Sequence, residues 1–542
     1  MSAMKLAEAL LANIQKQAGH LSLNSAQFLN WQSPVNRLPP DVLSMIFQFV
    51  PDLPYTELDY VLWGDNGSPP WLPYYVNVGP CVQLTHVCRY WRHLTLNLPT
   101  LWANVVDSER SDVPISVVLQ RSQAVPLNIS LLGRPSPGML SFLSYGGTER
   151  VRSVWWEGDS SRECPIYLNF PAPKLESVSL MGEVTEQDRH VRVSSIFKGH
   201  TPRIQQLFLA SMSWLPSNNM PSLTHLNLSG YACPGLSSKI LSLLERTPNL
   251  VDLGLSNIRD SSILPESRVI SLPRLRRFSY RPGDGATGLG SILPHLALAD
   301  DTALCMHVAA PEELARPVGL SHLPAVKTVV RACVVQDVYV CDFMAVGPAS
   351  GFDVCIYTAD SEDFDAMLKL ALEELPLVQI KELWVVENPV CCEMTPSGRD
   401  SFRSVLHSMP DLENLVVMEE SLDNLVDALL ASPDPLRPPL SRKNMTVHII
   451  MERSGVDPST VSSLIGRLKE VDVAHIIIGY HKTYTGPRFD DAPSLLRGFE
   501  SVESRYHNTL PLMDMPPVCT TYSHFYWPSW LESWPRQLDR SE

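Results

Sequence analysis

The sequence has little that supports redox, metal or nucleotide chemistry. Its 11 cysteines are an odd number, they are scattered along the chain, and no Cys-x-x-Cys pair occurs. We therefore expect reduced cysteines that act as small buried apolar side chains rather than a disulfide framework or a zinc site. The motifs GxxxxGK[ST], HExxH and GxSxG are absent, and the 15 histidines show no metal-ligand spacing. We expect no cofactor, no bound metal and no catalytic residue.

Basic charge and long apolar runs are also scarce. The chain has 43 Lys and Arg against 58 Asp and Glu, which gives a net charge of −15 and disfavours binding to nucleic acid or to an anionic membrane surface. No apolar run approaches the ~18 residues of a membrane-spanning helix. The first 20 residues fit an amphipathic helix and not a signal peptide. These features predict a protein of the cytosol or nucleus.

One glycine-rich segment resembles a dinucleotide-binding loop in its spacing, Gly283-Asp-Gly285-Ala-Thr-Gly288. Such a loop needs a strand before it and a helix after it, so that backbone amides can meet the phosphates. Pro282 precedes the segment and Pro294 cuts short any following helix. The segment is therefore interpreted as a loop and not as a nucleotide site.

A short apolar phrase recurs from residue 171 onward. Its form is Pro-x-aliphatic-x-x-apolar-x-apolar. Strong copies begin at Pro173, Pro202, Pro221, Pro248, Pro273 and Pro410, and weaker ones at Pro324 and Ile380. The copies from Pro173 to Pro273 are spaced in the ~20–29-residue range of leucine-rich repeats, in which each phrase is a short strand. Helical periodicity lies between several copies, near residues 236–244, 364–375, 422–430 and 458–469.

Two amphipathic helices are predicted near the start of the chain, over residues 34–50 and 82–98. A segment at 51–80 with six prolines and three glycines separates them. Leu38-Pro39-Pro40-Asp41-Val42-Leu43-x-x-Ile46-Phe47 opens the first helix, and Val87-Cys88-Arg89-Tyr90-Trp91-Arg92 lies in the second. These phrases, followed by Leu98-Pro99-Thr100-Leu101-Trp102, resemble an F-box of the fungal type.

The resemblance implies a substrate-recognition subunit of an SCF-type (Skp–cullin–F-box) E3 ubiquitin ligase. In such a protein the F-box docks a Skp-type adaptor, which links to cullin and RING subunits, and the remaining chain binds an unidentified target protein. The implied adaptor-binding residues are Leu38, Pro39, Pro40, Val42, Leu43, Ile46, Phe47, Val87, Cys88 and Trp91. The same apolar residues also fit the internal core of a helical bundle, and that alternative stays open.

The sequence departs from the F-box and repeat patterns in two ways. The segment between the two helices is longer than the usual form. Four repeats carry Met212, Tyr231, Ile258 or Glu420 where asparagine or cysteine is usual, so we expect irregular repeats. A protein-interaction scaffold of leucine-rich repeats without a ligase role remains the alternative function, and an enzyme of unrecognised class is a third.

The expected fold class is therefore α+β or an α/β solenoid, a helical F-box followed by an irregular leucine-rich-repeat horseshoe. The expected divisions are an N-terminal helix and tail at 1–32, the F-box at 33–104, a linker with first strands at 105–170, repeats at 171–480, and a C-terminal cap or tail at 481–542. The aromatic residues in that last segment, which include Tyr522, Trp527 and Trp530, fit either a cap or a partner-binding tail. Candidate target-binding side chains are Gln205, Gln206, His225, Asp252, Arg276 and Glu413.

Overall fold

The computed structural model describes most of the chain. The described residues are 11–18, 25, 28, 30, 32–50, 78–108, 114–145, 147–158, 161–183, 191–260, 268–282, 292–308, 320, 323–336, 340–357, 361–387, 396–430, 444–452, 458–489, 496–522, 524, 527 and 529–530. The glycine-rich segment at 283–288 and most of the proline-rich segment at 51–80 lie outside them. The chain divides into two compact units: unit 1 comprises Met1–Glu183 and Ile196–Arg203, and unit 2 comprises Val184–Ser195 and Ile204–Glu542.

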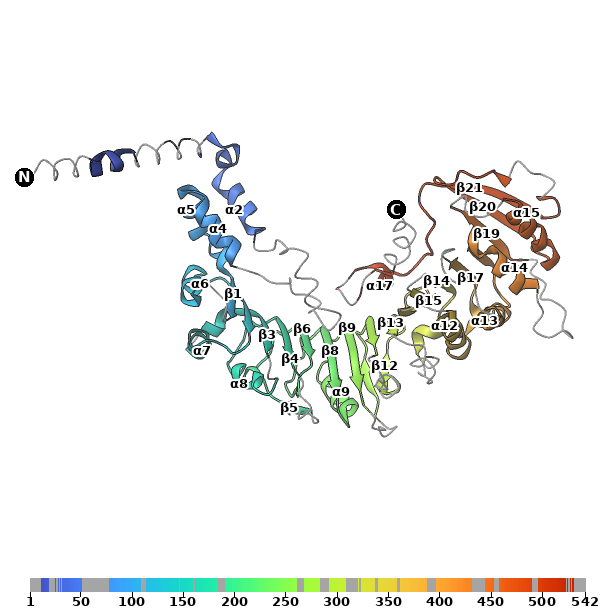
Figure 1. Cartoon of the computed structure of the whole chain (residues 1–542). Helices are drawn as coiled ribbons and strands as arrows, with labels where there is room; N and C mark the ends of the chain where they lie inside the picture. Colours follow the sequence, from blue (N-terminus) through green and yellow to red (C-terminus); the bar gives the residue numbers. More distant parts are fainter. Residues whose placement is uncertain are drawn as a thin grey trace, which may run out of the picture. The chain divides into compact units, whose positions relative to one another are not determined.

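Unit 1 begins with short helices and continues into four parallel strands (Figure 1). The helical elements are η1 (Pro34–Arg37), α2 (Pro40–Gln48), α4 (Gly79–Val87), α5 (Arg89–Leu96), η2 (Pro99–Trp102), α6 (Ile115–Arg121), α7 (Pro137–Ser144), η3 (Gly147–Arg150), α8 (Cys164–Tyr167) and η4 (Phe197–Gly199). The strands are β1 (Asn104–Ser108), β2 (Leu127–Leu132), β3 (Val151–Gly158) and β4 (Ser177–Gly182), and each pairs with the next in parallel.

Unit 2 carries a long series of paired strands. In order of pairing they are β6 (Gln206–Ala210), β8 (His225–Ala232), β9 (Asp252–Arg259), β11 (Arg277–Arg281), β13 (Ala303–Val308), β16 (Gly351–Tyr357), β15 (Val340–Val346), β14 (Arg331–Gln336), β17 (Glu382–Glu387), β18 (Asn414–Met418), β19 (Thr446–Met451), β20 (His475–His481) and β21 (Ser501–His507). Only β15 runs antiparallel to both of its neighbours. Two small parallel pairs stand apart, β5 (Arg192–Ser194) with β7 (Trp214–Pro216) and β10 (Ile270–Leu272) with β12 (Leu296–Leu298).

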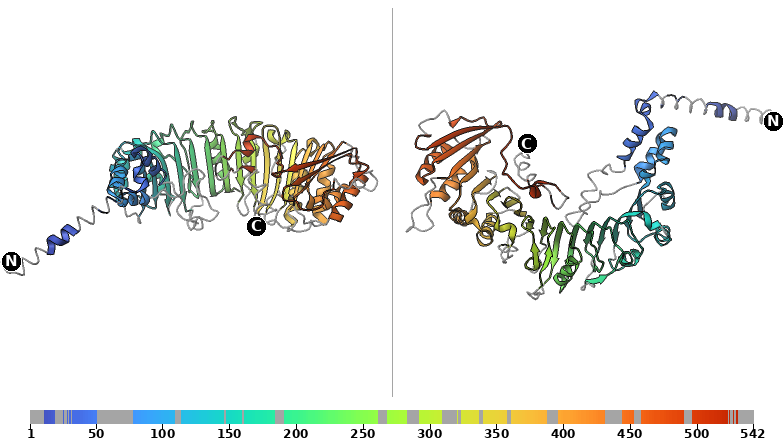
Figure 2. Two further views of the ribbon diagram at one scale, coloured as in Figure 1. Left: turned by 90° about the horizontal axis from the view of Figure 1, so that it is seen from above. Right: turned by 180° about the vertical axis from the view of Figure 1, so that it is seen from behind.

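Helices cover one face of the strands in unit 2. They are α9 (Leu236–Leu244), η5 (Leu293–His295), α11 (Pro324–Lys327), α12 (Ser361–Glu374), η8 (Leu377–Gln379), α13 (Pro396–His407), η9 (Glu419–Ser421), α14 (Leu422–Leu430), α15 (Pro458–Arg467) and η10 (Leu468–Val471). Helices α12 to α15 pack side by side in sequence order, as Figure 2 also shows. Because side chains alternate along a strand, every second residue faces these helices.

Each strong copy of the apolar phrase ends in a strand, which confirms these predicted strand positions, whereas the weaker copy at Pro324 begins a helix, α11 (Pro324–Lys327). The fourth residue after the proline is the first residue of β4, β6, β8, β9, β11 and β18. The predicted helical segments likewise coincide with α9, α12, α14 and α15. The phrase alternates apolar residues that bury one strand face, and the proline stops the preceding element.

The predicted fold class is nevertheless wrong. In place of a helical F-box followed by a repeat horseshoe, the structure has a 17-stranded, mostly parallel sheet with short helices between its strands, an α/β-type fold. The apolar phrase identifies single strands but not how many of them join one sheet. Strands without the phrase, among them β1 to β3 and β13 to β16, also belong to this sheet.

The C-terminal segment of unit 2 crosses the strand face opposite the helices. Met513, Met515, Cys519, Trp527 and Trp530 are each at most 8% exposed. They form one apolar cluster with strand residues from β13, β14, β15, β17, β18 and β19. A short helix, α17 (Pro517–Thr520), lies within this segment. We call the described residues 510–522, 524, 527, 529 and 530 the C-terminal strap.

No helix in the described part of the chain is long and apolar enough to cross a membrane.

Candidate functional site

Helix α2 has one buried and one exposed apolar face. It begins at Pro40, where a proline fits the first helical turn, and Asp41 adds a favourable negative charge at this end. Leu43 and Phe47 are 0% and 1% exposed and anchor the helix to its own unit. They are four residues apart, so they lie on the same side of the helix.

Four other apolar residues of this segment lie at the surface. Val42, Met45, Ile46 and Phe49 are 38%, 61%, 44% and 71% exposed. Their spacing of three, one and three residues places them along one side of a helical turn, with Phe49 at the C-cap of α2. We call these four residues the α2 stripe. Large exposed apolar side chains that gather in one place indicate an interaction surface more often than singly scattered ones do.

The buried face of α2 is held by Trp91 of α5. The Trp91 ring centroid lies 4.8 Å from that of Phe47, and its indole Nε1–H donates to Asn36 Oδ1 at 2.6 Å. Cys88 caps α5, because its Sγ accepts from the backbone N–H of Trp91 at 3.5 Å. These contacts tie η1, α2 and α5 together without using the α2 stripe, so the stripe is presented on a fixed helix.

The predicted adaptor-binding residues therefore fall into three groups. Leu43 and Phe47 are buried; Leu38, Cys88 and Trp91 are partly buried; Pro39, Pro40, Val42, Ile46 and Val87 are exposed. Val87 is 53% exposed at the end of α4. Met45 and Phe49 were not among the predicted residues. The helical period that selected Val42 and Ile46 could have found them, because both lie on the same side of the helix.

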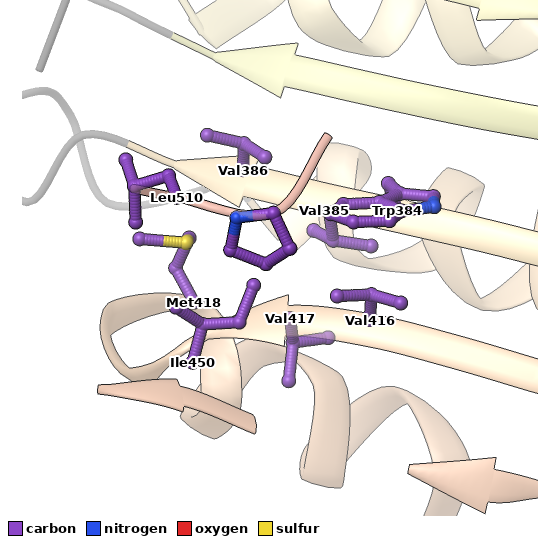
Figure 3. A pocket seen from close by; sticks show the side chains of 9 residues that line it. Trp384, Val385, Val386, Val416, Val417, Met418, Ile450 and Leu510 are labelled. Atoms are coloured by element: carbon purple, nitrogen blue, oxygen red, sulfur yellow. The ribbon is translucent and has the colours of Figure 1, made fainter. Parts of the chain in front are cut away.

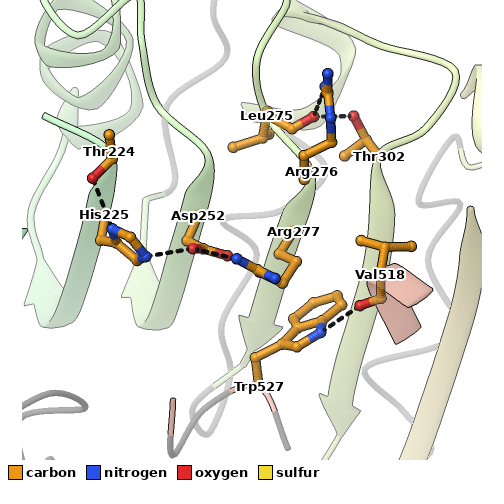
Figure 4. A network of polar contacts seen from close by, with 9 residues as sticks. All are labelled: Thr224, His225, Asp252, Leu275, Arg276, Arg277, Thr302, Val518 and Trp527. Carbon is orange, nitrogen blue, oxygen red and sulfur yellow. Dashed lines mark hydrogen bonds and ion pairs between the residues drawn. The ribbon is translucent and has the colours of Figure 1, made fainter. Parts of the chain in front are cut away.

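A second polar arrangement lies on the strands of unit 2 (Figure 4). His225, Asp252 and Arg277 begin β8, β9 and β11 and are direct partners in the strand register. His225 Nε2 lies 2.7 Å from Asp252 Oδ2, and the Arg277 guanidinium bonds both carboxylate oxygens of Asp252. We call these three residues the sheet-face network.

Asp252 is the centre of this network and is only 2% exposed. Burial alone raises the pKa of its carboxyl group, but the hydrogen bonds from His225 and Arg277 outweigh burial and lower that pKa below its usual value. The ring of His524, in the C-terminal strap, lies 6.4 Å from that of His225 in an edge-on orientation. The network therefore holds a buried negative charge next to the strap.

The structure brings together only some of the predicted target-binding side chains. Gln206, His225 and Asp252 share one row across neighbouring strands. Gln205, Arg276 and Glu413 each lie one position before a strand, where Arg276 pairs with Asp301 at 3.0 Å and Glu413 with Lys381 at 2.8 Å. Arg277 completes the row but was not predicted. Its position, four residues after the phrase proline, is the signal that would have found it.

A small apolar hollow lies where the C-terminal strap meets β17, β18 and β19 (Figure 3). Trp384, Val386, Val416, Met418, Ile450 and Leu510 contribute to its lining. No charged side chain is among its lining residues. Its lining is almost wholly apolar, so the hollow has the character of imperfect packing between the strap and the strands.

One buried cysteine of unit 2, Cys305, has a histidine and a carboxylate beside its thiol, as catalytic cysteines often do. Cys305 Sγ lies 3.3 Å from His307 Nε2 and 3.4 Å from Asp353 Oδ2. Burial raises the pKa of the Cys305 thiol well above its usual value, and burial lowers the pKa of His307 to about 3. A neutral, buried thiol is a poor nucleophile. The described residues contain no group of three His, Cys, Asp or Glu side chains that could hold a metal ion.

Comparison of the chain with protein-family models and with curated proteins gave no match in either case.

Proposed function

We propose that this chain is a substrate-recognition subunit of an SCF-type ubiquitin ligase. The α2 stripe docks a Skp-type adaptor, and unit 2 holds a target protein. The chemistry of ubiquitin transfer then belongs to the other subunits. The cytosol or the nucleus, where such ligases work, is the proposed location.

The observation that carries the proposal is the exposure of the α2 stripe. Val42 and Ile46 belong to the F-box-like phrase, and the structure leaves both at the surface together with Met45 and Phe49. An apolar helix face laid into a groove on a partner is a common mode of recognition, in which residues spaced three and four apart act as anchors. The F-box resemblance supports the Skp-type adaptor as that partner.

The notable polar and apolar arrangements of unit 2 are engaged within its own fold. The sheet-face network is satisfied by its own members, Cys305 is a buried thiol, and the hollow at Leu510 has an apolar lining. Unit 2 offers a long surface of strands and loops on which a protein target can be held. The identity of the target is left to experiment.

The test is capture of the adaptor by purified full-length protein. The substitutions Met45→Ala and Phe49→Ala together remove the two most exposed anchors of the stripe. If each truncation costs about 1–2 kcal/mol of binding free energy, the affinity for the adaptor falls roughly 30-fold or more. A matched control is Val269→Ala with Val378→Ala, which removes two side chains that are 65% and 60% exposed in unit 2.

Two results would contradict the proposal. One is a wild-type protein that captures no Skp-type adaptor, which would favour an interaction scaffold without a ligase role. The other is adaptor capture that the stripe variant and the control variant weaken to the same extent. Mass spectrometry of proteins that co-purify with the wild type and not with the stripe variant then identifies the adaptor and its linked subunits.

A further inference from the structure

Strand β21 forms an edge of the strand series in unit 2. Its one strand partner among the described residues is β20, with which it pairs in parallel from Ser501 to His507. Figure 1 shows β21 next to β20, after β19. Val502 and Tyr506 are 38% and 60% exposed, and Ser501, Glu503 and Arg505 are exposed as well. A seven-residue edge strand of this kind is a template for pairing with another strand.

The hydrogen bonds at the two ends of β21 fix which residues face β20. The Ser501 N–H donates to the Ala474 carbonyl at 3.2 Å, and the His507 carbonyl accepts from the Lys482 N–H at 3.0 Å. In a parallel ladder, successive residues direct their N–H and C=O groups to opposite sides. Odd-numbered residues therefore face β20, and the backbone groups of Val502 and Ser504 point away from it.

The sequence of β21 is complementary to itself when it is reversed about Ser504. An antiparallel pair centred there places Glu503 opposite Arg505 of the second strand, and Arg505 opposite Glu503. It also places Val502 opposite Tyr506, a β-branched residue against an aromatic one, which is a favourable cross-strand pair. Ser504 meets its own copy, and its outward N–H and C=O groups are those that a hydrogen-bonded antiparallel pair requires.

Neighbouring registers are less favourable. Centring the pair on residue 503 would oppose two glutamates, and centring it on residue 505 would oppose two arginines. A pair centred between two residues would place residues whose backbone groups point away from β20 opposite residues whose backbone groups point toward β20. Opposite charges directly across a strand pair are favourable and like charges are not, so the charge pattern selects the Ser504 register.

The side chains are already positioned for this pairing. Arg505 and Glu503 bond each other within the strand at 2.8 and 3.0 Å, so both heads lie on one side of the sheet. On the other side, Tyr506 stacks on Tyr480 with ring centroids 5.7 Å apart, and the Arg488 guanidinium lies 5.1 Å from the Tyr506 ring centroid. The exposed Tyr506 ring is thus held in place beside the edge.

We propose that β21 pairs antiparallel with β21 of a second copy of this chain, which produces a twofold-symmetric dimer centred on Ser504. Each copy then presents the same patch, as a twofold interface requires. The interface is small, so the dimer is concentration-dependent and exchanges with monomer. This proposal does not depend on adaptor docking, because it uses residues of unit 2 alone.

Sedimentation velocity of the full-length chain over a range of concentrations tests the dimer. Ser504→Pro removes an N–H that points away from β20, so it spares the β20–β21 ladder and blocks the central pair. We expect at least tenfold weaker dimerisation for Ser504→Pro and little change for Ser504→Ala, which keeps the N–H. A dimer that both variants leave unchanged would overturn the proposal.

A charge-exchange experiment separates the contact between chains from the one within a chain. Glu503→Arg alone and Arg505→Glu alone each oppose like charges across the dimer, so each is expected to sediment as a monomer. An equimolar mixture restores opposite charges at both positions and should form a mixed dimer, although each chain still carries its own internal like-charge pair. A mixture that stays monomeric, or a wild type that is monomeric and instead captures an extended segment of another protein on β21, would refute the dimer.

Discussion

Two apolar faces of this chain differ in what covers them. In unit 2, the face of β13 to β19 is covered by the C-terminal strap, whose Trp527 and Trp530 are 1% and 3% exposed. In unit 1, the α2 stripe keeps Met45 and Phe49 61% and 71% exposed. Apolar area that is removed from water within the chain stabilises the fold, whereas area left exposed is available to a partner. The difference predicts that the strap contributes to stability and the stripe to binding.

The largest expected effect is the removal of a strap anchor. Trp527→Ala leaves a cavity in the apolar cluster and deletes the hydrogen bond from Nε1 to the Val518 carbonyl, which is 3.0 Å long. A buried tryptophan truncated to alanine costs about 3–5 kcal/mol of unfolding free energy. Urea denaturation measures this loss. Tyr522→Ala in the same segment is the control, because Tyr522 is 56% exposed, and an equal loss in both variants would show that the strap is not a packed element.

A somewhat smaller loss is expected when the sheet-face network is broken. Asp252→Ala leaves His225 and Arg277 without their shared carboxylate partner on strands next to the strap. Removing one member of a largely buried charged group costs about 2–4 kcal/mol once the partial exposure of its partners is allowed for. Thermal or urea unfolding tests this value. Glu413→Ala breaks the exposed pair with Lys381 and should leave the unfolding midpoint unchanged; similar losses in both variants would contradict a buried network.

The unfolding free energy should also depend on pH through His524, a buried residue of the C-terminal strap. Burial lowers the pKa of His524 to about 4, below the ~6.5 of an exposed histidine. As the pH falls below ~6.5, the unfolded chain binds a proton at this residue and the folded chain does not. The contribution of His524 is therefore complete above pH ~6.5 and is lost towards pH 4, at a limiting rate of about 1.4 kcal/mol per pH unit.

His524→Gln tests this contribution directly. The variant should lose less unfolding free energy than the wild type between pH 7 and pH 4.5, whatever its stability at pH 7. Urea denaturation at both pH values provides the comparison. An identical loss in both proteins would show that His524 titrates alike in the folded and unfolded chains.

The smallest effect on stability is expected at the α2 stripe, where the two faces of one helix can be compared. Phe49→Ala should change the unfolding free energy by no more than about 0.5 kcal/mol, because Phe49 is largely exposed. Phe47→Ala, two residues away, should cost about 3–5 kcal/mol, because Phe47 is 1% exposed and packs on Trp91. Equal costs at the two positions would mean that the stripe is part of the core.

The sequence predicted local elements well because each has a local cause. The apolar phrase contains the alternation that buries a strand face, and its proline ends the element before it, so β8 and β9 began where expected. Helix α9 was recognised by its helical period. The number of strands in one sheet depends on pairing between distant segments, and for this reason the predicted fold class was wrong.

The candidate site was predictable only in part for a similar reason. Val42 and Leu43 are consecutive residues of a helix, and apolar residues recur at helical spacing from each of them. The sequence therefore could not say that Leu43 faces inward and Val42 outward. The side of the helix that is buried is set by Trp91, which packs on Phe47 although it lies 44 residues further along the chain. Likewise, the path of the C-terminal strap over β13 to β19 follows from contacts between distant residues, which the aromatic residues of its sequence did not reveal.

The most direct test of the central claim is hydrogen exchange of the full-length protein with and without the Skp-type adaptor. We expect the amides of residues 40–49 to exchange more slowly when the adaptor is bound, because docking on the α2 stripe restrains the helix. The amides of α12 in unit 2 should be unaffected. Adaptor binding that protects another segment and leaves residues 40–49 unchanged would contradict the account, as would the absence of any binding.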